Sequence, residues 1–92
     1  MSVNQQPGIY TQTSSTGTIR SGRGFLRHIL VSSTSSGTIK IYDNTAASGT
    51  VILETFTPTA GQTLDFGNLL FETGLHIVVA NTIEFTVVYG EI

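Results

Sequence analysis

The chain has 92 residues, a net charge of −2 and charged side chains at only 11% of its positions. This length predicts one small domain of marginal stability, for which oligomerisation is a common remedy. Four lysines and arginines are too few for the phosphate contacts that nucleic acid binding requires, so we expect no nucleic acid partner. The absence of cysteine excludes disulfides and thiolate chemistry.

The first part of the chain is predicted to be an extended arm over residues 1–21, followed by one domain over residues 22–92. Met1 to Gly8 is polar and ends in a Pro-Gly pair, which is a loop signal. Ile9 to Thr13 and Thr18 to Arg20 are candidate short edge strands within the arm. The N-terminus lacks the basic and apolar regions of a secretory signal, and no run approaches the ~20 apolar residues of a membrane helix. We therefore expect neither secretion by that signal nor a membrane partner.

An arginine between two glycines, in Ser21-Gly22-Arg23-Gly24, has two interpretations. One is a backbone nest that binds an anion. The other, which the composition favours, is a tight connection into the next strand.

The centre of the chain, from Gly24 to Phe56, is predicted to form three strands joined by two polar turns. Alternation places Ile39 and Ile41 on one face of the middle strand. The first strand, Phe25 to Val31, is apolar on both faces, so we expect an interior strand covered on both sides, with a second subunit as one cover. The strands are expected at Gly24–Val31, Thr38–Tyr42 and Thr50–Phe56, and the turns at Ser32–Gly37 and Asp43–Gly49.

The C-terminal part alternates most regularly, and it contains no helix signal. Its alternation predicts that Ile83, Phe85, Val87 and Tyr89 point inward. Pro58 interrupts the pattern because proline cannot donate a ladder hydrogen bond. The expected strands are Thr63–Phe66, Leu69–Phe71, Leu75–Ala80 and Ile83–Tyr89, with turns at Gly67-Asn68 and Asn81-Thr82. About eight short strands separated by turns predict an all-β fold, a small antiparallel β-sandwich or jelly-roll-like domain.

Residues able to carry out chemistry are sparse. His28 and His76 lie in predicted strands, and with an acid such as Asp43, Glu54 or Asp65 they are one hypothesis for a metal site or a small hydrolase. Hydrogen-bonded structural histidines are the preferred interpretation, because metal motifs usually have tighter ligand spacing. The six acids are scattered singly, and no nucleophile–base pair or phosphate-binding loop is present. We expect no enzyme activity and no cofactor.

A carbohydrate-binding module is a further hypothesis. Small β-domains bind sugars on aromatic platforms, and Tyr42, Tyr89 and Phe56 are the candidates here, with Asn44 as a polar partner. The chain has no tryptophan and only three tyrosines, so packing or interface roles are the preferred interpretation of these rings.

Four short motifs stand out between about Leu26 and Tyr89: Tyr42-Asp43, the Ser48-Gly49-Thr50 turn, Thr73-Gly74-Leu75 and the closing Thr86-Val87-Val88-Tyr89. In these motifs the segment resembles small β-rich proteins encoded by tailed bacteriophages. Such proteins are virion components, including capsid decoration or cement proteins, and have no catalytic residues to transfer.

This resemblance implies a non-enzymatic structural protein located in the virion and made in the host cytoplasm. We expect a homo-oligomer, with a trimer favoured, that contacts the major capsid protein or other virion proteins. The arm would become ordered on a neighbouring subunit. The residues predicted to form the interfaces are Pro7, Ile9, Tyr10, Arg20, Arg23, Arg27, Tyr42 and Tyr89.

Overall fold

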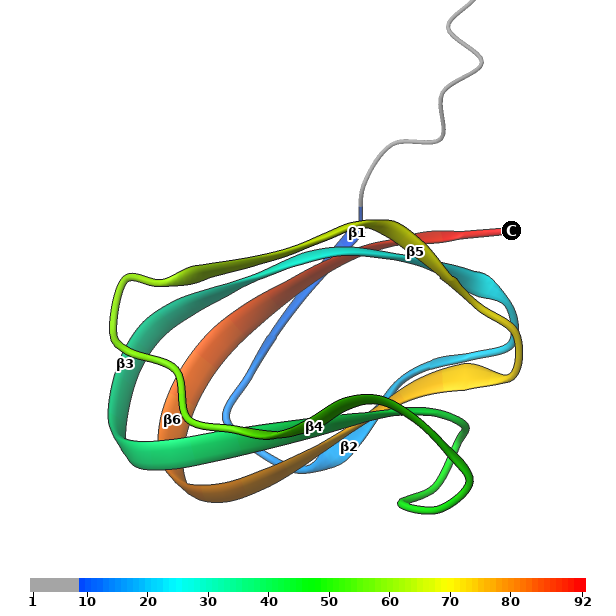
Figure 1. The fold of residues 1–92 in the computed structure, drawn as a ribbon. Coiled ribbons are helices and arrows are strands. Elements are labelled where there is room, and N and C mark those ends of the chain that lie inside the picture. Colours follow the sequence, from blue (N-terminus) through cyan, green and yellow to red (C-terminus); the bar gives the residue numbers. More distant parts are fainter. Residues whose placement is uncertain (1–8) are drawn as a thin grey trace, which may run out of the picture.

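The structure, a computed structural model, describes residues 9–92, which form six β-strands in one antiparallel sheet (Figure 1). The all-β prediction is confirmed. Within residues 9–92 there is no helix of the length and apolarity that crossing a membrane requires. The strands are β1 (Ile9–Thr13), β2 (Gly17–Ser21), β3 (Gly24–Asp43), β4 (Thr50–Phe56), β5 (Thr63–Phe71) and β6 (Gly74–Glu91).

The two long strands, β3 and β6, pair along almost their whole length and form the centre of the sheet. Both bend midway, so that the sheet doubles over and its two halves face each other (Figure 1). The β5 half consists of β1, residues 85–91 of β6, residues 24–31 of β3, and β5. The β4 half consists of β2, residues 74–80 of β6, residues 38–43 of β3, and β4.

The structure has six strands instead of about eight, because three expected turns lie inside continuous strands and join the candidate segments on either side of them. Ser32–Gly37 and Asn81-Thr82 are the bends of β3 and β6, and Gly67-Asn68 is an irregularity within β5. Ser36, Asn68 and Asn81 adopt positive φ angles there, as does Gly67. Polar residues and glycine therefore mark these positions correctly, but they curve a strand here without ending it.

The bend is built by extra residues in β3. Between the pairs Leu26–Tyr89 and Tyr42–His76, β3 advances 16 residues while β6 advances 13, through three register shifts. Gly37 lies buried at the bend, against Ile83 and Thr82 of β6. Each extra residue increases the local twist and curvature, which allows one pair of strands to serve both halves.

One of these shifts explains the apolar residues on both faces of Phe25 to Val31. Arg27 is the extra residue of a bulge, so Leu26 and Ile29 both point into the core despite their odd spacing. The strand is interior within the sheet, between β6 and β5. Within residues 9–92, however, only its inward face is fully covered, and Leu30 on the other face is 40% exposed.

The core lies between the two halves and comes mainly from β3 and β6. The predicted inward faces of the Thr38–Tyr42 and Ile83–Tyr89 segments are confirmed. By contrast, β4 does not alternate strictly, because its pairing with β3 contains two register shifts. The buried hydrophobic residues are Leu26, Ile29, Val31, Ile39, Ile41, Phe71, Leu75, Ile77, Ile83, Phe85, Val87 and Tyr89.

The two short strands expected within the N-terminal arm are present and belong to the same sheet. β1 pairs with residues 85–89 of β6, and β2 pairs with residues 74–77 of the same strand. Ile9 and Ile19 pack against the core. Residues 9–21 therefore extend the sheet that the following residues form, and the remainder of the arm lies outside the described residues.

Candidate functional site

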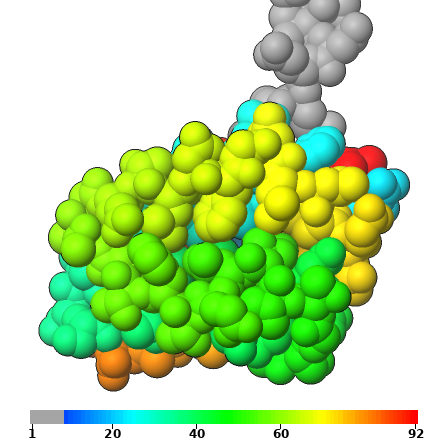
Figure 2. Space-filling model, viewed as in Figure 1, coloured from blue at the N-terminus to red at the C-terminus, as the bar shows by residue number. Residues whose placement is uncertain are grey.

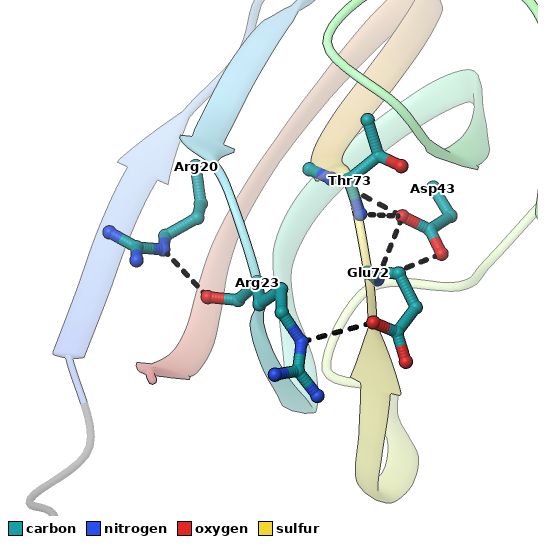
Figure 3. Close-up of polar contacts among 6 residues, drawn as sticks. Arg20, Arg23, Asp43, Glu72 and Thr73 are labelled. Atoms are coloured by element: carbon teal, nitrogen blue, oxygen red, sulfur yellow. Dashed lines mark hydrogen bonds and ion pairs between the residues drawn. The ribbon is translucent and has the colours of Figure 1, made fainter.

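The carboxylate of Asp43 holds the β5–β6 turn against the end of β3 (Figure 3). Its Oδ1 accepts the backbone N–H of Thr73 at 2.8 Å and of Gly74 at 3.2 Å, and Glu72 N–H donates to both oxygens at 3.0–3.1 Å. Burial raises the pKa of this carboxyl, but the three backbone donors outweigh burial and hold the pKa below its ordinary value of 3.8. Asp43 is therefore a structural anion, fully engaged by the fold.

Two of the three arginines predicted for the interface form ion pairs. Figure 3 shows the pair of Arg23 with Glu72, and Arg20 beside Arg23. Arg20 Nη1 lies 3.0 Å from Glu91 Oε2, and its Nε donates to the Arg23 carbonyl at 3.1 Å. Arg23 Nε lies 3.0 Å from Glu72 Oε1, in an exposed pair. These arginines join chain segments that are distant in sequence.

The backbone of Gly22 supports the interpretation of Ser21-Gly22-Arg23-Gly24 as a tight connection into the next strand. Gly22 has φ +110°, and its N–H donates to the Thr73 carbonyl at 2.9 Å. That N–H is therefore committed to the fold, which leaves it unavailable for an anion. The glycine permits the tight turn from β2 into β3 because an L side chain is strained at this φ.

Three of the five exposed large apolar side chains of residues 9–92, those of Tyr10, Leu30 and Leu70, lie on the outer face of the β5 half. Directly opposite residues in an antiparallel pair share a face, so the register aligns Tyr10, Val88, His28 and Asp65 in one row across four strands. Tyr10 is 73% exposed. The neighbouring rows add Leu30, and Phe25 opposite Leu70. We call the set Tyr10, Phe25, His28, Leu30, Leu70 and Val88 the apolar outer face.

The outer face of the β4 half is more polar. His76 Nδ1 lies 2.8 Å from Thr18 Oγ1, which in turn donates to the Thr45 carbonyl at 3.0 Å. Tyr42 lies opposite His76 in the register, and Lys40 Nζ lies 5.2 Å from the centre of its ring. These contacts fasten β2 and the loop after β3 to the sheet.

The two histidines lie on the outer faces of different halves, which the core separates. The geometry therefore does not bring them together for a shared metal or for catalysis. Across residues 9–92 no group of three or more histidine, cysteine or acidic side chains is placed to hold a metal ion. His76 has the hydrogen bond expected of a structural histidine.

The remaining predicted interface and sugar-binding residues are also dispersed. Tyr89 is only 7% exposed and packs in the core, so it is not available as the exposed ring that the carbohydrate-binding hypothesis requires. Ile9 packs against the core beside exposed Tyr10, and Arg27 sits at the β3 bulge beside Gly90. Pro7 lies outside the described residues. Asn44 closes its own loop by donating to the Ser48 carbonyl at 2.8 Å.

An apolar groove, which the sequence did not reveal, opens between β4 and β5. Figure 2 shows the face on which these two strands meet, with a hollow along their junction. Its volume is about 280 Å³. The residues that line it are Leu53, Phe56, Thr63, Leu64, Asp65 and Phe66. Leu30 and Leu70 on the outer face were likewise missed, because their exposure depends on the pairing of strands and not on local pattern.

No protein-family model, curated protein or solved structure matches this chain. Among the described residues, the surfaces that stand out are therefore the apolar outer face and the β4–β5 groove. Both are suited to contact with other molecules by shape and apolarity, and neither presents a constellation of reactive side chains.

Proposed function

We propose that the chain is a non-enzymatic structural protein of a tailed-phage virion, a capsid decoration or cement protein that acts by forming interfaces. In this proposal it assembles as a homotrimer and contacts the major capsid protein. We also propose that the doubled-over sheet is a small sandwich of jelly-roll type. The resemblance of the segments around Tyr42-Asp43, Thr73-Gly74-Leu75 and Thr86 to Tyr89 supports the virion assignment.

The observation that carries the interface role is the apolar outer face. Tyr10, Leu30 and Leu70 are 73%, 40% and 41% exposed, and the register places all three on one face, on β1, β3 and β5. Several exposed apolar side chains on one face of a small protein indicate an interaction surface, since single exposed apolar residues are ordinary but grouped ones are not. Aromatic enrichment and few charges are also typical of the centre of interfaces.

The low charge of the chain agrees with a permanent place in an assembly. Weak electrostatic repulsion between copies favours association. A small domain also gains stability by mass action when its folded form binds neighbours, and the shell gains stability in return. The carbohydrate-binding alternative has less support, because Tyr42, Tyr89 and Phe56 do not share a surface.

The first test is the solution mass of the purified protein by light scattering on a sizing column. We expect a trimer of the 9.8 kDa chain that dissociates when Leu30→Asp places a charge on the apolar outer face. Ala60→Asp, in an exposed turn between β4 and β5, is the matched control and should leave the mass unchanged. An unaltered mass for Leu30→Asp, with a native circular dichroism spectrum, would refute the role of this face.

The virion assignment has its own test. We expect the chain to sediment with purified phage particles, as detected by mass spectrometry, and its removal to lower the temperature at which the heads rupture. Deletion of residues 1–8 should sharply weaken attachment if the arm contacts a neighbour. A chain found only in the soluble fraction of the lysate would contradict the assignment.

A further inference from the structure

The apolar lining of the β4–β5 groove comes from the inward side chains of two strands that lie at the same edge of the sheet. Leu53 and Phe56 of β4 lie opposite Ile41 and Ile39 of β3, and Leu64 of β5 lies opposite Ile29. Among residues 9–92, β4 and β5 each pair with β3 alone. The groove is thus the edge of the hydrophobic core, left open between two free strand edges.

The size of the groove decides what fits it. At about 280 Å³ it lies at the lower limit of pockets that enclose a drug-sized ligand, which start near ~300 Å³. One or two apolar side chains fill such a space. The free backbone N–H and C=O groups along β4 and β5 suit the main chain of an extended peptide, which adds to a sheet edge while alternate side chains enter the pocket. The groove therefore fits a peptide better than a sugar or a compact small molecule.

The charge at the groove indicates the chemistry of that peptide. Asp65 is the one charged residue of the six that line the groove, and it is exposed at the rim, because the register places it on the outer face opposite His28. Its Oδ1 accepts the Gly67 N–H at 2.9 Å. Glu54, which follows Leu53 on β4, is paired with Lys40 at 3.4 Å, and neither β4 nor β5 contains a lysine or arginine. A basic side chain on the peptide, next to the apolar side chain that enters the groove, complements the negative charge of Asp65.

We propose that this groove binds an extended segment of another protein, which inserts an aliphatic or aromatic side chain between β4 and β5 and places a lysine or arginine beside Asp65. Residues 1–8 of a second copy fit this description less well, because they contain no basic side chain. The proposal requires a protein partner but not a place in a virion, so it stands or fails independently of the proposed function.

The test uses a fluorescein-labelled peptide, Lys-Thr-Val-Thr-Phe-Thr-Val-Thr-Lys, and the same peptide with glutamate at both ends. Fluorescence anisotropy at low salt should show the lysine peptide binding about fivefold or more tightly than the glutamate peptide. Asp65→Asn keeps an acceptor for Gly67 and should abolish this preference, and Asp65→Lys should reverse it. Glu84→Lys, an exposed acid on β6 that does not line the groove, is the matched control and should preserve the preference.

Backbone amide shifts measured by NMR locate the site independently of the variants. We expect the lysine peptide to shift the amides of Leu53, Leu64 and Phe66 most strongly. Three results with the peptides would overturn the proposal: no binding of either peptide up to millimolar concentration, equal binding of both peptides, or amide shifts confined to the apolar outer face. Chemical shifts of the groove amides that change with protein concentration in the absence of peptide would also overturn the proposal, because they would indicate a second copy as the occupant.

Discussion

Replacement of Gly37 by alanine tests whether the bend of β3 and β6 requires a residue without a side chain. The Cβ that alanine adds would lie 2.5 Å from Ile83 Cβ, 2.5 Å from the Thr82 carbonyl oxygen and 2.9 Å from Thr34 Oγ1. Favourable contacts between carbon atoms lie at ~3.5–4 Å. The Thr82 carbonyl oxygen is a backbone atom, and Ile83 Cβ is bonded directly to the backbone. Neither atom can therefore move aside without shifting β6 relative to β3.

We expect this overlap to lower the free energy of unfolding by about 2–3 kcal/mol, within or slightly above the cost of one overpacked methyl group. A domain of this size has a total stability on the order of 5–10 kcal/mol. The corresponding fall in Tm is roughly 10–20 °C. Thermal and urea unfolding followed by far-ultraviolet circular dichroism measures both quantities.

Gly17→Ala is the matched control, because no atom lies within 4 Å of the Cβ it would add and its φ is not positive. We expect this variant to stay within about 0.5 kcal/mol of the wild type. Gly37→Ala with equally unchanged stability would refute the close packing of the bend, and with it the reason that one pair of strands can curve through both halves of the sheet.

Three further variants test other parts of the structure. Asp43→Asn should lower the free energy of unfolding by about 1–3 kcal/mol at neutral pH. Because the pKa of Asp43 is lowered by folding, its contribution is present above pH 3.8 and is lost as the pH falls through the folded pKa. Urea titrations at pH 7 and below pH 3.8 should therefore show the variant and the wild type converging at acid pH, and a constant gap would contradict the anchor. Arg23→Ala, which breaks an exposed pair with Glu72, should change the free energy of unfolding by less than about 0.5 kcal/mol, with a larger loss in the same titration indicating a deeper role. Phe85→Ala should cost about 3–5 kcal/mol or abolish folding, as measured by thermal unfolding, because the ring is fully buried in the core; a cost near 1 kcal/mol would show that this part of the core is loosely packed.

The class of the fold and much of its core could be predicted from the residues alone. Regular alternation in Ile83 to Tyr89 and Thr38 to Tyr42 identified the inward side chains correctly, because a strand exposes successive residues to opposite faces whatever its partners are. The absence of helical periodicity was equally decisive. Both properties are local, so they can be recognised in the sequence without knowledge of the strand pairing.

The ends of the strands and the exposed surfaces could not be predicted in this way, because they depend on how the strands pair. The turn-like residues at Ser32–Gly37 and Asn81-Thr82 bend β3 and β6 without interrupting them, since each strand keeps its hydrogen-bonding partner through the curve. The bulge at Arg27 likewise moves Ile29 into the core. The local sequence pattern cannot predict a bulge, because a bulge is defined by how the strand pairs with its neighbour.

The candidate surfaces follow the same rule. Tyr10 and Leu70 are distant in the sequence, and they lie on one face because β6 and β3 connect their strands in register. The groove between β4 and β5 exists because both strands pair with one partner and leave the space between them open. Composition indicated that the chain is suited to contacts and poor in reactive groups, whereas the location of those contacts is a property of the doubled-over sheet.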